Sequence, residues 1–346
     1  MKTFNKSRNL LLLALDWTRP KDPPLSLGHA SIFTNLKLNG VKVQEMSYSV
    51  NNPSFNPLDV CDSILKNTDE FTDIGIGAYV WNEKAVQIIL KELRNRNFKG
   101  RIIMGGPQIS YVKDNHEKYY READIFVKGY AEEAMLKLMT TPFENKSKIK
   151  PGILGIKYSG EPFLGKSANV NLEEIPSVYL NNIIKPQKFI RWESQRGCPF
   201  KCSFCQHRES DSVFMKRKQF NEDRIFKEIE WICNNKVIED IAVLDPTFNS
   251  GNKYLEILSC FISNGFKGKL SLQTRMEMVN DEFLNLVEKL NQHGQCVLEF
   301  GLQTIHSEEQ KIIERPNNMK KVDRIINQIN SMNIPYEVSI IYGLPN

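Results

Sequence analysis

Three of the seven cysteines lie close together and carry the clearest chemical signal in the chain. Cys198, Cys202 and Cys205 have the spacing C-x3-C-x2-C, in a loop that directly follows an apolar segment. Three thiolates this close can bind three corners of a [4Fe–4S] cube, and the fourth iron is then open to a small molecule. The other cysteines are isolated, which is not typical of a disulfide framework, so we expect a reducing compartment.

Zinc is the alternative occupant of this segment. His207 lies two residues after Cys205 and could complete a Cys3His set. Structural zinc sites usually pair C-x2-C units, and this spacing does not. A zinc-stabilised binding protein is therefore the non-enzyme alternative.

The cysteine segment resembles the signature of the radical S-adenosylmethionine (SAM) superfamily. Phe204 matches the aromatic residue that usually precedes the last cysteine of that signature. The resemblance implies that the amino and carboxylate groups of SAM chelate the open iron. It also implies that one electron from the cluster cleaves SAM to methionine and a 5′-deoxyadenosyl radical.

The downstream sequence has the alternation that this family's partial (β/α)6 barrel requires. With the apolar segment before the cysteines as the first strand, the second to fifth strands are predicted at 241–245, 270–274, 297–301 and 338–342. Asn221 and Asn280 are predicted to cap the helices that precede the strands at 241–245 and 297–301. Active sites of such barrels form at the carboxyl ends of the strands.

Polar motifs close these strands, and the resemblance implies that they bind SAM. The second-strand motif begins at Asp245 and ends at Asn249, and Arg275 closes the third strand. Glu299 and Gln303 match the E-x-G-x-Q pattern, whose polar groups reach the SAM ribose and carboxylate. The expected SAM-binding set, with the adenine contact of the fifth strand last, is Phe204, Asp245, Asn249, Arg275, Glu299, Gln303 and Ile341. The catalytic residues stay unknown.

The first half predicts a flavodoxin-like, doubly wound parallel sheet. Short apolar strands are expected at 9–15, 41–46, 72–77, 101–104 and 124–127, and helices at 26–39, 57–66, 82–95 and 131–139. Such sheets bind ligands at the carboxyl ends of their strands. Glycines lie there, and glycine allows a ligand to approach the backbone closely.

A flavodoxin-like domain ahead of such a barrel resembles the cobalamin-binding radical SAM enzymes. The resemblance implies a cobalamin site at Gly77, Gly105, Gly106, Pro107 and Gly129. The family's D-x-H-x-x-G motif, which supplies a histidine to cobalt, is absent after the first strand. Cobalamin is therefore expected without a histidine ligand.

The expected domains are a cobalamin-binding-like domain at 1–145, a linker at 146–185 and a radical SAM core at 186–346. Glycines and prolines fill the linker, which is expected to contain a small hairpin at 152–163. The chain ends directly after the motif of the fifth strand. We therefore expect a barrel truncated after that strand and a chain that is a fragment.

Composition limits the other classes. The 346 residues favour two domains, and 41% hydrophobic residues exclude a mainly disordered chain. No apolar run approaches the roughly 20 residues that span a bilayer, so a cytoplasmic protein is expected. The net charge of +5 is concentrated at 185–218, whereas a nucleic-acid-binding protein normally has a broader basic face. This basic stretch could dock an acidic electron donor such as flavodoxin or ferredoxin.

The predicted function is a cobalamin-dependent radical SAM enzyme that methylates an unactivated carbon of a small molecule or peptide. The alternative enzyme catalyses rearrangement, cyclisation or oxidation, and its first domain is only a scaffold. A methylthiotransferase is disfavoured because the first domain has only Cys61 and cannot hold a second three-cysteine cluster.

Overall fold

The computed structural model describes residues 8–141, 155–163, 165, 167–206 and 217–344. Two compact units make up the chain, residues 1–171 and 172–346. Their boundary falls inside the stretch 146–185 that was expected to be a linker. Part of that stretch, however, belongs to the sheet of the first unit.

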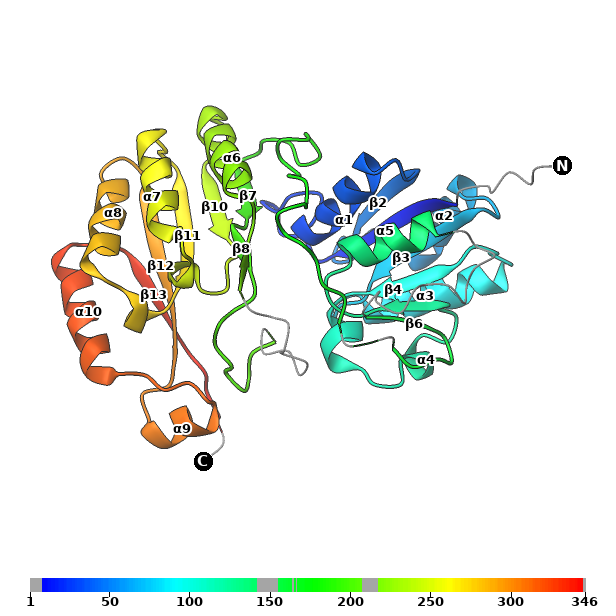
Figure 1. Cartoon of the computed structure of the whole chain (residues 1–346). Helices are drawn as coiled ribbons and strands as arrows, with labels where there is room; N and C mark the ends of the chain where they lie inside the picture. The colour runs from blue at the N-terminus through cyan, green and yellow to red at the C-terminus, as the bar shows by residue number, and fades with distance from the viewer. Residues whose placement is uncertain (1–7, 142–154, 164, 166, 207–216, 345–346) are drawn as a thin grey trace. The chain divides into compact units, whose positions relative to one another are not determined.

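The first unit is built on a six-stranded sheet (Figure 1). Its strands are β1 (Asn9–Asp16), β2 (Val43–Ser49), β3 (Thr72–Gly77), β4 (Ile102–Gly105), β5 (Ile125–Val127) and β6 (Ile156–Tyr158). They follow the order β2-β1-β3-β4-β5-β6, and the first five are parallel. The order 2-1-3-4-5 is that of the flavodoxin-like fold.

Helices cover both faces of this sheet, which explains the continuous apolar run of β1. Leu11 and Leu13 belong to the core under α2 (Pro57–Asn67) and α3 (Glu83–Asn95). Leu10 and Leu12 point to the opposite core, which α1 and α5 complete. These two helices span Leu27–Leu38 and Glu132–Thr140. A strand buried on both sides needs apolar residues at every position.

The predicted hairpin at 152–163 is wrong. Residues 152–154 lie outside the described part of the chain, and Ile156–Tyr158 pairs antiparallel with β5 instead. β5 has only three residues, and β6 satisfies the backbone groups of its free edge. Two further elements were not expected from the sequence, a π-helical turn at Gln108–Val112 and a short helix α4 at His116–Tyr119.

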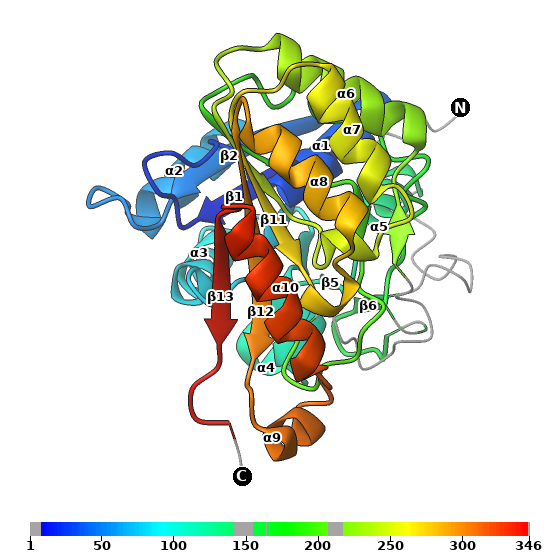
Figure 2. The same ribbon diagram turned by 90° about the vertical axis from the view of Figure 1, so that its left-hand side faces the viewer.

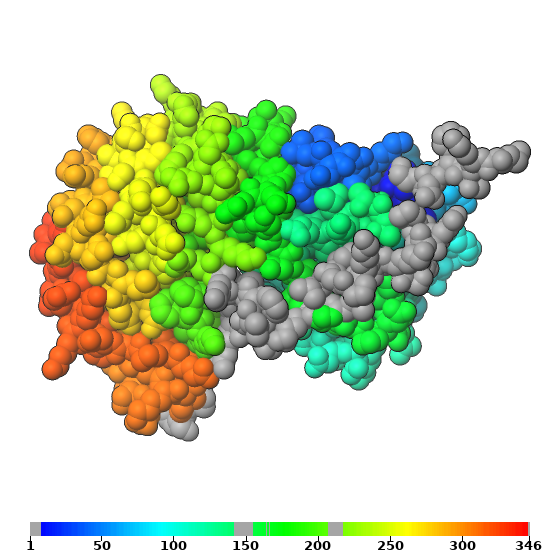
Figure 3. Space-filling view, viewed as in Figure 1, coloured from blue at the N-terminus to red at the C-terminus, as the bar shows by residue number. Residues whose placement is uncertain are grey.

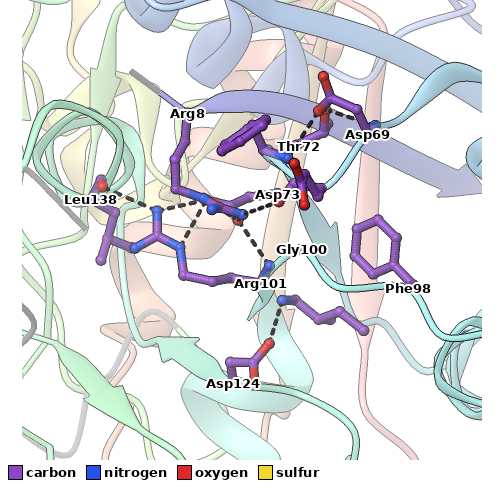
Figure 4. A network of polar contacts seen from close by, with 12 residues as sticks. Arg8, Asp69, Thr72, Asp73, Phe98, Gly100, Arg101, Asp124 and Leu138 are labelled. Carbon is purple, nitrogen blue, oxygen red and sulfur yellow. Dashed lines mark hydrogen bonds and ion pairs between the residues drawn. The ribbon is translucent and has the colours of Figure 1, made fainter. Parts of the chain in front are cut away.

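A buried ion-pair network lies at the amino ends of the strands, away from the ligand-binding edge (Figure 4). The carboxylate of Asp73, which is fully buried, accepts bonds from Arg8 at 2.6 Å and from Arg101 at 2.6 Å. Asp73 also accepts a bond from the backbone N–H of Arg101 at 2.8 Å. The network therefore ties the segment before β1 to β3 and β4.

A second ion pair in this unit makes its stability depend on acid pH. The Lys157 ammonium lies 2.7 Å from Glu117 Oε1, which also accepts a bond from the Gly160 N–H. Partial burial alone would raise the pKa of Glu117, but the Lys157 ammonium and two backbone N–H groups lower that pKa to about 2.

Because the folded pKa of Glu117 is below its ordinary value of 4.5, the pair stabilises the fold above that pH. The contribution is lost as the pH falls from 4.5 toward 2. We expect wild type to lose about 1 kcal/mol more stability than Glu117→Gln over this interval, since the pair is partly exposed. Thermal unfolding from pH 7 to pH 3 measures this difference, with the exposed Glu161→Gln as control. Parallel pH profiles of wild type and Glu117→Gln would contradict it.

The second unit has a five-stranded parallel sheet in the order β13-β12-β11-β10-β7. These strands span Phe189–Trp192 (β7), Asp240–Val243 (β10), Lys269–Thr274 (β11), Gln295–Gln303 (β12) and Tyr336–Ile340 (β13). Each strand lies beside the next parallel strand in the chain, as in a β/α barrel opened at one side. β13 forms one edge of the sheet (Figure 2).

Helices join these strands. They are α6 (Glu222–Asn234), α7 (Tyr254–Ser263), α8 (Asp281–Asn291), α9 (Ser307–Ile312) and α10 (Met319–Ser331). Two of them, α6 and α8, were predicted from the sequence. The two predicted caps are confirmed, since Asn221 accepts a bond from Arg224 N and Asn280 one from Phe283 N. Side chains of α7, α8 and α10 form a continuous outer surface over the strands (Figure 3).

Two short strands, β8 (Gln195–Arg196) and β9 (Lys218–Gln219), pair antiparallel on either side of the cysteine segment.

In the described ranges, no helix combines the length and the hydrophobicity that a membrane crossing requires.

Candidate active site

A cavity of about 260 Å³ lies at the carboxyl ends of β11 and β12 and beside the cysteine loop. Seven of the predicted site residues line it: Cys198, Cys202, Cys205, Phe204, Arg275, Glu299 and Gln303. The fold therefore brings together the cysteine motif and parts of three strand-end motifs, those at Asp245–Asn249, Arg275 and Glu299–Gln303, which follow it by about 40 to 105 residues in the sequence.

None of the three cysteines of the motif takes part in a disulfide. Cys202 is buried, and Cys198 and Cys205 are half-buried. No three His, Cys, Asp or Glu side chains of the described residues converge closely enough to hold a single metal ion. A four-iron cube binds each thiolate at a different iron, so its ligands stand further apart than those of one ion. The proposed fourth zinc ligand, His207, lies outside the described residues.

Asp245 holds the segment that leads into the cysteine loop. Its Oδ1 accepts bonds from the backbone N–H groups of Ser194, at 2.8 Å, and Gln195, at 3.1 Å. Its Oδ2 lies 2.5 Å from the Ser194 hydroxyl. Burial raises the pKa of Asp245 to about 7 although these bonds favour the charged form. Asp245 itself does not line the cavity, so the structure gives it a positioning role.

Asn249 also holds backbone. Its amide donates to the Arg275 carbonyl at 2.9 Å and its oxygen accepts from the Arg275 N–H at 3.0 Å. These two bonds fix the end of β11, from which the Arg275 side chain extends along the cavity wall and stacks over Phe200. Asn249 is buried and, like Asp245, does not line the cavity.

Asp245→Ala should destabilise the chain by about 2 kcal/mol, because two buried N–H groups would lose their acceptor. Asp245→Asn should recover most of this loss, since its oxygen can still accept both bonds and the Ser194 hydroxyl can reverse. The folded pKa of Asp245 lies above its ordinary value of 3.8, so the folded state keeps its proton longer. The stability of wild type relative to Asp245→Asn should therefore fall as the pH rises toward 7.

Urea unfolding of the metal-free chain at pH 5 and pH 8 measures both effects. The exposed Asp323→Ala on α10 is the control. An Asp245→Ala variant as stable as wild type would contradict the positioning role.

Gly301 of the E-x-G-x-Q pattern lies against the end of the Gln303 side chain, which would have to move if Gly301 carried a Cβ. A Cβ on Gly301 would lie 2.5 Å from Nε2 of Gln303. Gln303 has a φ of 71°, a conformation that non-glycine residues rarely adopt and that often marks functional sites. Glu299 lies opposite Glu337 on β13, and burial together with this second carboxylate raises its pKa.

Ile341, the predicted adenine contact, lies just past β13 and does not line the cavity. Its backbone N–H donates to the Gln303 carbonyl at 2.9 Å, and its side chain is half-buried. The neighbouring Ser339 lines the cavity instead. Sequence reasoning also missed Phe200, Thr247 and Arg315, which line the cavity. Phe200 stands between two motif cysteines, and that position was the available signal.

The predicted cobalamin residues lie at the carboxyl edge of the first sheet. Gly77 ends β3 and Gly105 ends β4. Gly106 and Gly129 have φ values of 89° and 96°, and a Cβ on either would lie within 3 Å of backbone atoms. The packing of the protein's own backbone therefore requires glycine at these two positions. A Cβ on Gly105 would meet only the Val127 carbonyl at 3.6 Å, so the protein's own packing does not require that glycine.

Exposed aromatic side chains follow three strands of the same edge. The exposed Trp17 follows β1, Trp81 follows β3 and Tyr111 follows β4, and the half-buried Tyr79 lies beside Trp81. The Tyr79 and Trp81 rings stack with centroids 4.6 Å apart, and Trp17 is 59% exposed. Exposed apolar groups at a ligand-binding edge favour a large, flat ligand over a surface left to solvent.

The first unit contains two histidines, His29 on α1 and His116 on α4. Burial lowers the pKa of His29 to about 4, so its half-buried ring is neutral. His116 is buried between Phe126 and Phe163, and its Nε2 lies 3.0 Å from the Ile109 carbonyl. His116 is therefore part of the core.

The radical SAM superfamily model matches residues 192–346, which include the whole cavity wall described above. The chain carries a radical SAM domain. The resemblance drawn from the cysteine motif is confirmed. The match runs from the last residue of β7 through β13 and begins close to the expected start of the radical SAM core.

The curated relatives of the radical SAM domain protein are methyltransferases. The cobalamin-dependent radical SAM methyltransferase TokK of Streptomyces tokunonensis is 25% identical over 53% of this chain and 28% of its own. The 2-(S-pantetheinyl)-carbapenam-3-carboxylate methyltransferase of Streptantibioticus cattleyicolor is 25% identical over 58% and 31%. An uncharacterized methyltransferase of Pyrococcus horikoshii is 26% identical over 62% and 48%. The chain thus spans about half of their length or less.

A solved structure shares the fold of both units. The cobalamin-dependent SAM radical enzyme OxsB, with aqua-cobalamin and SAM bound, matches 97% of this chain and 49% of its own with a TM-score of 0.74. Sequence identity is 16%, so the match establishes the fold. The α/β architecture with parallel sheets is confirmed.

Proposed function

We propose that this radical SAM domain protein is a cobalamin-dependent enzyme that methylates an unactivated carbon. One observation carries the proposal: the three motif cysteines line the same cavity as Glu299 and Gln303. The curated relatives with methyltransferase names support the reaction type. We also infer that the second sheet is the family's partial (β/α)6 barrel.

The donor set fits a [4Fe–4S] cluster. Three cysteines that form no disulfide line one cavity with two guanidinium groups, those of Arg275 and Arg315. Nε of Arg315 is buried and has no hydrogen-bond partner among the described residues, which suits a site that an anionic group completes. A bound cluster with SAM supplies a 5′-deoxyadenosyl radical that abstracts hydrogen from the substrate.

The cavity residues would then bind SAM. Glu299, whose pKa is raised, and Gln303 are placed to hydrogen-bond the ribose and the carboxylate. Phe204 and Arg275 form walls of the cavity. Ile341, proposed to contact the adenine, lies outside the cavity lining, so adenine bound there would extend past Ser339 at the end of β13. Asn249 holds the backbone of Arg275, and Asp245 holds the backbone of Ser194 and Gln195, which leads into the cysteine loop.

Cobalamin would bind at the carboxyl edge of the first sheet and supply the methyl group. Gly77, Gly105, Gly106, Pro107 and Gly129 are its proposed backbone contacts. The exposed Trp17, Trp81 and Tyr111 offer an apolar surface to a flat macrocycle. The D-x-H-x-x-G motif is absent after β1, so we propose that cobalt has no histidine ligand from the protein.

The substrate is proposed to be a small molecule, with a peptide as the alternative. The reductant is proposed to be flavodoxin or ferredoxin, whose acidic surface would meet basic residues near the cysteine loop such as Lys201. Reducing conditions of the cytoplasm suit the free cysteines. Neither a membrane nor a nucleic acid is among the proposed partners.

One observation favours the scaffold alternative. Backbone packing alone requires glycine at positions 106 and 129, so these two glycines need no cobalamin to explain them. The histidine motif that would supply a cobalt ligand is also absent. In that case the first unit would not bind cobalamin, and the enzyme would catalyse rearrangement, cyclisation or oxidation.

Hydroxocobalamin binding by the full chain distinguishes the two. We expect the pigment to co-elute with the protein on gel filtration and to quench tryptophan fluorescence. The double variant Trp17→Ala, Trp81→Ala should bind at least about tenfold more weakly, since two large contacts are lost. Wild-type protein that elutes without pigment would contradict cobalamin binding and support the scaffold alternative. One zinc per chain without acid-labile sulfide would instead support the zinc-stabilised binding protein.

A further inference from the structure

Arg315, in the segment that follows α9, makes a direct contact with the cysteine motif. Its Nη1 lies 3.6 Å from Sγ of Cys202, a distance at which a guanidinium donates to sulfur. Its Nη2 donates to the Gly301 carbonyl of the E-x-G-x-Q strand end. One side chain therefore links the cysteine loop to the end of β12.

Backbone contacts hold this arrangement from both sides. The Ser203 N–H donates to the Ile313 carbonyl at 2.9 Å, and the Ser203 hydroxyl donates to the Ile312 carbonyl at 3.3 Å. The Arg315 N–H donates to the Gln310 carbonyl at 2.9 Å. The residue after Cys202 and the segment before Arg315 are thus fastened together, so the fold sets the distance between the guanidinium and the thiol.

The charge of Arg315 has no carboxylate partner among the residues that the structure describes. The other guanidinium of the cavity, that of Arg275, lies 3.2 Å from Glu277. A half-buried cation without a counter-ion favours an anionic neighbour, because water screens it only partly. Cysteine thiolates on an iron–sulfur cluster are such neighbours.

We propose that Arg315 donates a charged hydrogen bond to the Cys202 thiolate of the bound cluster and thereby raises the cluster's reduction potential. This inference rests on the proposed function. The reduced cluster carries one more negative charge than the oxidised one, so a cationic donor stabilises the reduced state more. Arg315 is in this sense a positioning and tuning residue for the electron-transfer step.

The test compares midpoint potentials of the full 346-residue chain, reconstituted anaerobically with iron and sulfide and titrated without SAM. Arg315→Met should hold about tenfold less reduced cluster at a given potential, which equals a shift of about 59 mV downward for one electron. Arg315→Lys should shift less, because it keeps the charge but cannot reach both partners. The control is Arg324→Met on the exposed face of α10, which should match wild type.

A spectroscopic measurement separates tuning from a purely structural role. Pulsed EPR of the reduced wild-type cluster with ¹⁵N-labelled arginine should show a nitrogen coupling that is absent in Arg315→Lys. Loss of loop packing alone would not produce such a coupling. Wild type without the coupling contradicts the proposed bond.

An Arg315→Met potential equal to that of wild type overturns the inference. If Arg315→Met retains no iron, Arg315→Lys decides: a lowered potential supports the bond, and an unchanged one overturns it. The iron and sulfide content of wild type is measured first. Wild type without a [4Fe–4S] cluster would overturn the proposed function together with the inference, whereas a normal cluster with an unmoved potential overturns the inference alone.

Discussion

Cys202→Ser is expected to abolish the cluster and reduce 5′-deoxyadenosine formation by more than about a hundredfold. Cys202 is the buried member of the three-cysteine set, so the other two thiols alone would have to retain the cluster. Loss of residues that merely orient a metal ligand already costs about 10–100-fold, and loss of a ligand should cost more. Iron and acid-labile sulfide per chain, and the nucleoside product by chromatography, measure the effect.

Cys260→Ser is the matched control for this prediction. Cys260 is half-buried on α7, away from the cavity, where Asn264 contacts its sulfur. Its replacement should leave the iron content and the nucleoside yield close to wild type. Thermal unfolding of both metal-free variants checks that each still folds. Full iron and sulfide in Cys202→Ser would contradict the assignment of the cluster to this motif.

The second large effect is expected at Asp73, in the network of Figure 4. Asp73→Asn should destabilise the chain by about 3–5 kcal/mol, because two guanidinium groups would stay at a buried site without their shared carboxylate. The side chains of Arg8 and Arg101 are only 11% and 9% exposed, so water cannot replace the lost charge. Urea unfolding followed by circular dichroism measures the free-energy change.

The same substitution at a surface ion pair provides the comparison. Asp62 pairs with Arg96, and the two side chains are 65% and 35% exposed. Asp62→Asn should therefore cost at most about 1 kcal/mol. Equal losses at Asp73 and Asp62 would show that burial does not set the strength of the Asp73 network.

The layout of both units follows from local patterns in the sequence. The run of leucines in β1 is apolar at every position because helices cover both faces of the sheet, and this signal predicts a parallel sheet. Asn221 and Asn280 predict helix starts because their side chains bind backbone N–H groups a few residues later. β6 could not be predicted, since three residues show no periodicity and their partner β5 lies about 30 residues earlier.

In the site, the cluster-binding cysteines were easier to predict than the residues whose role depends on what they contact in the folded chain. The cysteines carry a spacing that few other sites share, and all three line the cavity. Asp245 and Asn249 were predicted to contact SAM, but in the structure they bind the backbone of segments 50 and 26 residues away. Arg315 was missed because only folding brings it to Cys202, 113 positions earlier.

The production of 5′-deoxyadenosine tests most directly whether the three cysteines form a radical SAM centre. The full chain would be reconstituted with iron and sulfide and given SAM and dithionite without oxygen. We expect the nucleoside to form with wild type and Cys260→Ser but not with Cys202→Ser. A wild-type chain that holds a full [4Fe–4S] cluster and binds SAM, yet forms no 5′-deoxyadenosine, would contradict the proposed radical chemistry.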